Sequence, residues 1–564
     1  MRARPHAFGL LLAIAASCSS PPAQRTGASP TAAAPAPEPG DASTPLLPRP
    51  RMLRWVPADT AYFFGVLTPP AADHVEREYI ARLAAYEQVL PAVERLRRAR
   101  PSEMKRLSFL MRLELSLLAE LGGTATREKL AGVGLDPVTV YAFYAIGMVP
   151  VVRIQLSDPA RFSAVLARVA ARLQIQRAAL AGQTYYGARE DALYWVLAVV
   201  DGDLVAAMIP PDQRAAVLPA VLGQRAPARS MATDRGLDRL AASYGLSPSG
   251  LGYVSMVSLA AAVGGALPAP CRDELTAMAG AVPRVVLGTT AATGQEMRLH
   301  SVVEMRSDLS AALRDLRGEV PRADPTSSAA AAIEIAAALD VGALVGGLGS
   351  TLDRIRARPF RCAALGWLND LARTQGKTLR QTGRALVGVR GASLAVRNID
   401  GLTSGGADLF FLFGTDRPGD LLDRLASSMG ARRPGLEPGD PPVELKLPIG
   451  ALLGAVHGAI GRRAVGLSIG AEARELTEML SADVVDDPPL FFMRIDPKVV
   501  AQLRALVVGN QPSADPRMAS IDADLARKLA DIDASANDRF AELSMIVRAT
   551  QRGLEIDFAG RYAR

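Results

Sequence analysis

VVRIQLSDPARFSAVLARVAARL, residues 151–173, contains the unit that decides the fold. Residues 151–156 are mostly apolar and predict a strand, which is followed by the turn Ser157-Asp158-Pro159. Apolar residues then recur at spacings of three and four, which is typical of a helix with one buried face. Aspartate suits the N-cap of that helix and proline its first turn. We therefore assign this aspartate a structural role and not a catalytic one.

The same strand–turn–helix unit recurs along the chain, with further copies beginning at residues 301, 409 and 490. Matching elements fall in the same order in the two halves, at an offset of roughly 260 residues. Residues 204–222 correspond to 464–480, and a hairpin at 284–305 corresponds to one at 543–560. The repetition predicts a tandem duplication of a whole domain.

The predicted fold class is α+β, with two similar halves from that duplication, each a largely antiparallel sheet covered on one face by helices. Long helices are expected over 71–100 and 103–121, where apolar positions keep a helical spacing. A chain of 564 residues is too long for one core. In chain order we expect a signal peptide (1–17), a tether (18–51), a first half (52–317), a linker (318–328) and a second half (329–564).

The first residues have the pattern of an export signal. Arg2 and Arg4 precede the apolar run 7–16, which is too short to span a membrane. The run ends at Ala15-Ala16-Ser17-Cys18, which resembles the bacterial lipobox. That resemblance implies cleavage before Cys18 and lipidation of its thiol. The alternative is ordinary secretion, with cleavage at a site of the A-x-A type.

Residues 19–50 are rich in Pro, Ala, Ser, Thr and Gly and predict a partly extended tether. At about 3.1 Å per residue it would reach at most roughly 100 Å. The apolar runs 139–152, 253–267 and 329–348 are interpreted as core elements and not as membrane spans. The expected location is the cell envelope, facing the periplasm, with acyl chains as the anchor. Ser19 favours the outer membrane, because an aspartate there would favour inner-membrane retention.

Besides Cys18 the chain has only Cys271 and Cys362. A pair of cysteines in an exported protein predicts a disulfide, which here would join the two halves. A closed loop of about 90 residues stabilises by about 4.5 kcal/mol in the chain-entropy model. The alternative is two buried free thiols.

The formal net charge of +7 does not predict nucleic-acid binding, because arginines and acidic residues interleave along the chain. The chain has four histidines, which are His6, His74, His300 and His457. They form no metal-binding motif, and we expect neither a metal nor a cofactor.

Residues 466–470 match the G-x-S-x-G pattern of a nucleophile elbow around Ser468. The fold that uses this elbow places its histidine after the serine, and no histidine follows His457. We therefore interpret the match as chance. Carboxylates are plentiful, but no particular pair is marked for a hydrolase.

Residues 55–64, WVPADTAYFF, enter an apolar strand through Pro-Ala-Asp-Thr. This entry and the strand–Asp–helix unit at 155–162 resemble a family of bacterial envelope lipoproteins whose domain has no assigned function. The resemblance covers most of residues 52–564 and implies an α+β envelope protein. It carries over no activity.

Three classes of function remain open. The absence of a complete catalytic constellation favours a non-enzymatic scaffold or binding protein of the envelope. A second class is a carrier or sensor of a lipid or another apolar ligand, held in a groove between sheet and helices. The third is a carboxylate-based hydrolase. The expected partners are the membrane, through acyl chains on Cys18, and either an envelope protein or an apolar ligand.

Overall fold

The structure is a computed structural model of the chain. The residues that it describes are 47–77, 109–121, 126–136, 139–190, 192–265, 267–320, 331–385, 388–397, 408–428, 435–446, 455–470, 473–481, 488–497, 499 and 539–563. The predicted signal peptide, Cys18 and residues 18–46 of the predicted tether lie outside the described residues. So do residues 321–328 of the predicted linker and residues 78–100 of the first long helix.

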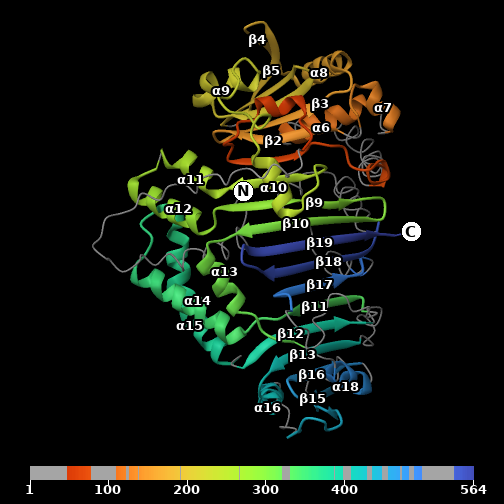
Figure 1. Cartoon of the computed structure of the whole chain (residues 1–564), viewed down its shortest axis with the longest axis vertical. Helices are drawn as coiled ribbons and strands as arrows, with labels where there is room; N and C mark the ends of the chain where they lie inside the picture. The colour runs from red at the N-terminus through yellow and green to blue at the C-terminus, as the bar shows by residue number, and fades with distance from the viewer. Residues whose placement is uncertain are drawn as a thin grey trace, which may run out of the picture.

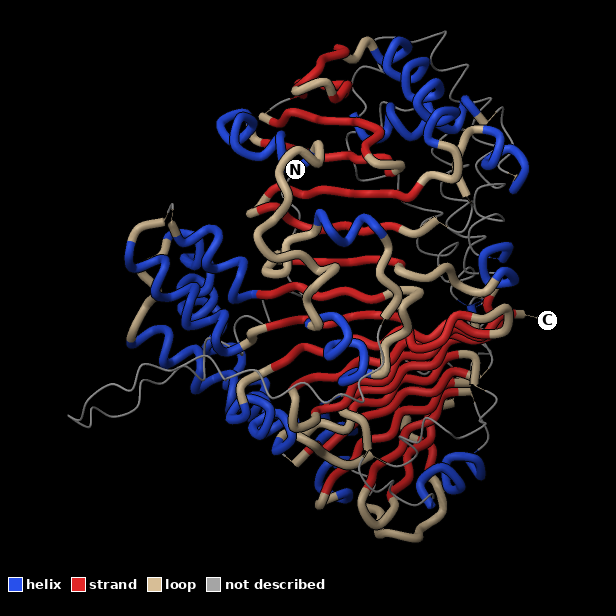
Figure 2. Tube along the Cα trace, turned by 45° about the horizontal axis from the view of Figure 1, so that its top comes forward, coloured by secondary structure: helices blue, strands red, loops and turns tan. Residues whose placement is uncertain are grey.

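The 19 strands of the described residues form one continuous sheet in which every pair of neighbours is antiparallel (Figures 1 and 2). The strands of the first half are β1 (Tyr62–Val66), β2 (Tyr141–Ile146), β3 (Val149–Gln155), β4 (Gln176–Leu180), β5 (Gln183–Glu190), β6 (Leu193–Val200), β7 (Asp203–Ile209), β8 (Leu251–Ser255), β9 (Arg284–Ala292) and β10 (Glu296–Glu304). Those of the second half are β11 (Ile333–Ala337), β12 (Val389–Val396), β13 (Leu409–Thr415), β14 (Val443–Glu444), β15 (Val456–Ile460), β16 (Ala464–Ile469), β17 (Phe491–Ile495), β18 (Phe540–Ala549) and β19 (Gly553–Tyr562). The mixed, largely antiparallel architecture predicted from the sequence is confirmed.

The strand order is the same in the two halves. In the first half it runs β4-β5-β6-β7-β3-β2-β1-β8-β9-β10. In the second it runs β14-β15-β16-β13-β12-β11-β17-β18-β19. Apart from the extra edge strand β4, each strand of one half has a counterpart in the other. The halves join where β10 pairs with β19, and these two strands are themselves counterparts.

Helices cover both faces of the sheet, so the expectation of a single covered face was wrong. In the first half, α6 (Phe109–Glu120) and α8 (Pro159–Leu173) share a core with Leu204 of β7. The next residue, Val205, points to the other face and packs with α9 (Arg214–Val221), α10 (Gly236–Tyr244) and the short helix η1 (Arg51–Trp55). In the second half, α16 (Pro418–Ser428) and α18 (Ala473–Ser481) lie on opposite faces in the same way.

The predicted cap of the quoted unit is present. The Asp158 side chain accepts hydrogen bonds from the backbone N–H groups of Ala160 and Arg161, at 3.1 and 3.0 Å. Since the cap fixes where α8 begins, the strand–turn–helix prediction holds here. A later copy differs, because α13 (Ser307–Asp315) has Arg306 at its N-cap and Asp308 pairs with that arginine.

Four helices gather at one end of the strands (Figure 1). They are α11 (Met256–Gly264) and α12 (Ala269–Ala281) between β8 and β9, and α14 (Val341–Ala357) and α15 (Gly366–Ala385) between β11 and β12. Cys271 of α12 and Cys362, which lies between α14 and α15, form a disulfide with an S–S distance of 2.11 Å. The predicted pairing is confirmed, and it links the two halves of the chain.

A charged pair lies in the core of the first half. Arg153 is completely buried, donates from Nε to Tyr144 Oη (3.1 Å) and donates from Nη2 to the Val221 carbonyl (2.9 Å). Asp203 Oδ2 lies 3.8 Å from Arg153 Nη1. Burial raises the pKa of Asp203 to about 6, against the opposing charge of Arg153. The loss of hydration on burial therefore disfavours the ionised form of Asp203, and the charge of Arg153 offsets only part of this effect.

The globular part begins inside the predicted tether. The Leu47 N–H donates to Asp238 Oδ1 at 2.9 Å, and Arg49 forms an ion pair with the same carboxylate. Asp238 lies on α10 and is only 1% exposed. Residues 47–51 are thus bound to the fold.

The remaining helical segments of the described residues are α2 (Ala72–Val75), α7 (Arg127–Gly132), η4 (Pro211–Gln213) and η5 (Ala363–Leu365). The described parts of the two predicted long helices include α2 and α6, which are helical as expected. None of the helices in the described ranges combines the length and the apolar character needed to cross a membrane.

Candidate functional site

An apolar pocket of about 360 Å³ lies between α11, α12 and the ends of β9 and β10. Eleven residues line it and all are apolar, with methionines at positions 148, 256 and 278. The volume falls in the range of roughly 300–1,000 Å³ that is usual for ligand sites. A polar group that entered would lose its hydrogen bonds to water without replacement. The pocket therefore suits a hydrocarbon.

The local sequence explains how this pocket forms. β8 runs directly into α11, where the Ser255 side chain caps the helix by accepting from the Ser258 N–H. α12 leads back into β9, and the register places Val285 of β9 opposite Val303 of β10 on one face. Two helices thus cover the apolar end of a hairpin. Met148, in the turn between β2 and β3, also lines the pocket and is 39% exposed, which places it at the opening.

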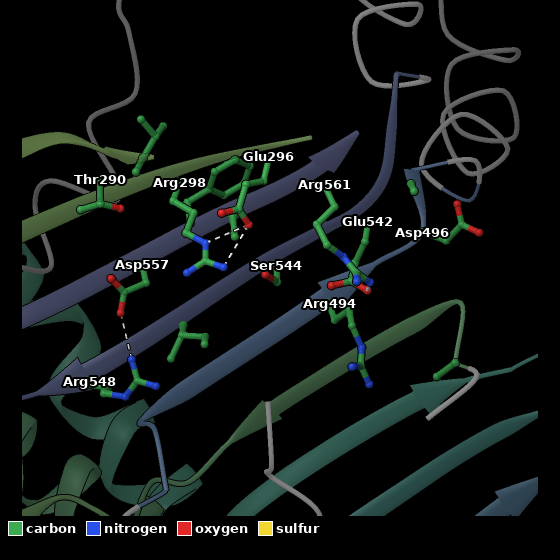
Figure 3. Close-up of a pocket in the computed structure, with 16 residues that line it drawn as sticks. Thr290, Glu296, Arg298, Arg494, Asp496, Glu542, Ser544, Arg548, Asp557 and Arg561 are labelled. Carbon is green, nitrogen blue, oxygen red and sulfur yellow. Dashed lines mark hydrogen bonds and ion pairs between the residues drawn. The ribbon is translucent and has the colours of Figure 1, made fainter. Parts of the chain in front are cut away.

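A second, polar cleft of about 860 Å³ lies over β10, β19, β18 and β17 (Figure 3). It is on the other face of the sheet, because Arg298 lines it whereas Val303 lines the apolar pocket, and the two alternate along β10. Val302, on the side of Arg298, packs in the core under α10, and Phe492 of β17 packs in the core under α18. Within the described residues, the cleft is the stretch of this face between those two helices that no helix covers.

Arginines and carboxylates alternate over this polar cleft. Its ion pairs are Arg298–Glu296 (3.0 Å), Arg548–Asp557 (2.9 Å), Arg561–Glu542 and Arg494–Glu334. Two of them are seen as dashed lines in Figure 3. A general acid needs a carboxyl whose pKa is raised. Asp557 shows the opposite, since its hydrogen bond with His300 and the charge of Arg548 lower its pKa.

His300 lies on the strand that joins the two halves. Its Nδ1 is 2.7 Å from Asp557 Oδ1 across the β10–β19 pair. This hydrogen bond raises the pKa of His300 and lowers the pKa of Asp557. Asp557 therefore stays ionised between His300 and Arg548, and its carboxylate carries a permanent negative charge near neutral pH.

The structure places Ser468 in regular strand, paired with Phe410 on one side and His457 on the other. A nucleophile elbow instead holds its serine in a sharp turn between strand and helix. Ser468 is completely buried, and neither its Oγ nor His457 Nδ1 has a hydrogen-bond partner among the described residues. The geometry agrees with the interpretation of the G-x-S-x-G match as chance.

The remaining histidine of the described residues, His74, lies against Tyr562, with 3.3 Å between Nδ1 and Oη. The described residues contain no group of three or more His, Cys, Asp or Glu side chains that could hold a metal ion. Of the predicted site residues, Cys271 and Cys362 come together, whereas Cys18 lies outside the described residues.

Sequence reasoning kept open an apolar groove between the sheet and the helices but located neither cavity, although each left a signal. α11, MVSLAAAVG, is apolar on nearly all sides, whereas a surface helix is usually amphipathic. Such a helix indicates a second apolar contact besides the core. In β10 and β19, charged residues occupy alternate positions of two long strands, which indicates a polar face where a core face was expected.

Compared with models of protein families, with curated proteins and with solved structures, the chain gives no match.

Proposed function

We propose that this protein is a lipid-anchored protein of the bacterial envelope that binds an apolar ligand without catalysing a reaction. The observation that carries the proposal is the pocket beneath α11 and α12, whose lining is wholly apolar. Its three methionines are flexible and polarisable, which suits a chain-like ligand of variable shape. Hydrolase chemistry would need a carboxyl with a raised pKa beside an ionised one, whereas the pKa of Asp557 in the polar cleft is lowered.

The proposed location rests on the N-terminal sequence. Cleavage before Cys18 would leave its thiol to carry acyl chains, with the following residues as a tether up to Leu47. The Cys271–Cys362 disulfide supports an exported protein, because disulfides persist in oxidising compartments and are rare in the cytosol. The periplasmic side of the outer membrane is the location that we favour.

The tandem duplication is also part of the proposal. Its main support is the shared strand order, which extends over every strand of the second half. The helices that follow corresponding strands agree as well, since α8 follows β3 as α16 follows β13, and α9 follows β7 as α18 follows β16. An order this long is hard to reach twice by independent routes.

Filling the pocket should remove ligand binding. Ala260 lines the pocket from α11, so Ala260→Phe would place a ring in the cavity. We expect the affinity for a fluorescent fatty acid, measured by titration with the purified protein, to fall about tenfold or more. The matched control is Ala261→Phe, one residue along the same helix, where the side chain is exposed and does not line the pocket.

Equal affinities of the two variants would contradict the proposal, as would a failure of the unaltered protein to bind the fatty acid. Ala260→Phe also overfills a packed region, which typically costs about 1–3 kcal/mol of stability. Circular dichroism and a denaturation curve should therefore show that the variant is folded at the temperature of the titration.

The anchor has a separate test. Cys18→Ser should move the protein from the membrane fraction to the soluble fraction after osmotic lysis, because the substitution removes the thiol that would carry the acyl chains. Ser19→Ala is the control and should stay with the membrane. Incorporation of labelled palmitate into the Cys18→Ser protein would contradict the proposed lipidation site.

The alternative function is a scaffold for another envelope protein. Two large apolar side chains on neighbouring strands, Leu287 of β9 and Leu299 of β10, are 38% and 39% exposed. Leu287 pairs with Ser301, two residues before Val303 of the pocket, whereas Leu299 also borders the polar cleft. Exposed apolar side chains of this kind would suit an apolar partner surface. A scaffold would still bind its partner protein when Ala260→Phe blocks the pocket, whereas a carrier would lose its apolar ligand. The same variant therefore distinguishes the two functions.

A further inference from the structure

We propose that the polar cleft over the junction of the two halves binds a ligand that carries several anionic oxygen groups, either carboxylates or phosphates. This site is on the opposite face from the apolar pocket and does not depend on the proposed function. The inference rests on which charged groups stand outermost in the cleft and on how they are spaced (Figure 3).

In two of the four ion pairs, Arg298–Glu296 and Arg561–Glu542, the guanidinium is the more exposed member. Arg548 and Asp557 are about equally exposed, and Arg494 and Glu334 are both largely buried. The side chain of Arg298 is 58% exposed against 30% for Glu296, and that of Arg561 is 64% exposed against 29% for Glu542. In the Arg298–Glu296 and Arg561–Glu542 pairs the carboxylate thus lies closer to the sheet, and the end of the arginine reaches out from it. A ligand that approaches these two pairs meets Arg298 and Arg561 before it meets their carboxylate partners.

Arg298 and Arg548 have N–H donors that their ion pairs do not use. Arg298 uses Nε and Nη2 on a single oxygen of Glu296, and Arg548 uses only Nη1 on Asp557. A guanidinium has five N–H donors in a planar fork that matches carboxylate and phosphate. Within the described residues, Nη1 of Arg298 and the Nε and Nη2 groups of Arg548 make no hydrogen bond. They can bind an anion without breaking the existing pairs.

The register of the strands sets the spacing of the charges. Arg298, Ala559, Ser544 and Arg494 lie in one row across β10, β19, β18 and β17. The two small residues form the floor between the two arginines, whose backbones are three strand spacings apart, roughly 14 Å. Arg561 is a diagonal neighbour of Arg298, at about 7–8 Å. One small anion cannot contact all three, whereas a ligand with repeated anionic groups can.

The test is isothermal titration calorimetry of the full chain at low salt. The probes are tripolyphosphate and a hexaglutamate peptide. Inorganic phosphate and acetate are the controls, because each carries only one anionic group. We expect at least one multivalent probe to bind and both controls to bind more weakly. Binding of tripolyphosphate alone would assign phosphate, and binding of hexaglutamate alone would assign carboxylate. No binding of either multivalent probe would overturn the proposal.

Two sets of variants distinguish a built site from the general positive charge of the protein. Arg298→Gln with Arg561→Gln should weaken binding of the multivalent probe by about tenfold or more. Glu542→Gln should have the opposite effect and raise the affinity for the multivalent probe about threefold, because it releases Arg561 from its partner. The matched control is Arg161→Gln with Arg474→Gln, two exposed arginines on α8 and α18 that do not line the cleft.

All three substituted sites in the cleft are on exposed or half-exposed side chains, so the variants should fold. If the control pair weakens binding as much as the cleft pair, the effect is long-range charge and the site is refuted. If Glu542→Gln weakens binding, the carboxylate is itself part of the recognition surface and the proposed anion chemistry is wrong.

Discussion

Removing the disulfide should be among the most costly changes that can be made to this protein. Replacing Cys271 and Cys362 together with alanine is expected to lower the free energy of unfolding by about 4–5 kcal/mol. The estimate follows from the 91-residue separation of the cysteines, since a loop of that length gives a large gain of entropy to the unfolded chain when it is opened. Alanine is chosen because both positions are buried, and serine would add a buried hydroxyl.

Urea denaturation followed by circular dichroism measures the change. Dithiothreitol provides the matched control, because it should shift the midpoint of the unaltered protein and leave that of the double variant where it is. Identical midpoints for the oxidised protein and the double variant would contradict the expectation. Free thiols at both positions in non-reducing peptide mapping would remove its basis.

The second large effect is expected at Arg153. In Arg153→Met, Asp203 would lose its nearest cation while staying buried, and Tyr144 and Val221 would lose a donor. Breaking a buried ion pair by removing one partner costs about 3–5 kcal/mol. Arg161→Met is the control, because Arg161 is 63% exposed and pairs with Asp158 on the surface. There we expect a loss below about 1 kcal/mol.

The loss at Arg153 should depend on pH in a defined direction. Burial already raises the pKa of Asp203 to about 6, above its unfolded value of 3.8. A carboxyl with a raised pKa binds its proton more tightly in the folded state, so its contribution to stability is present at low pH and lost as the pH rises through the folded pKa. Removing Arg153 raises that pKa further. The destabilisation should therefore be larger at pH 8 than at pH 5, and the reverse order would refute the assignment.

The sequence predicted the elements whose cause is local. Asp158 and Pro159 mark the start of α8 by capping chemistry, which needs only neighbouring residues. The hairpins of β9 with β10 and of β18 with β19 were expected from two apolar runs around a short turn, and the structure contains both. The Cys271–Cys362 pair followed from a count of cysteines and an assumed compartment.

What could not be predicted depends on contacts between distant parts of the chain. The pairing of β10 with β19 joins residues that are 249 to 265 positions apart, and no local pattern specifies it. The same pairing brings Arg298 of one half beside Ala559 and Arg561 of the other, so the polar cleft could not be found before the sheet was known. The apolar pocket likewise needs α11 and α12 to be placed over Val285 and Val303. Helices on both faces were missed because each amphipathic stripe is visible in the sequence but its side of the sheet is not.

The ladder between β10 and β19 has a consequence for the origin of the molecule under the proposed duplication. A single ancestral half would have exposed the edge of this strand, and two copies could have paired through it about a two-fold axis, as an isologous homodimer does. Fusion of the two genes would have turned an association that weakens on dilution into one with a fixed effective concentration. Under that proposal each half would then have been free to diverge, since the link between them no longer required identical sequences.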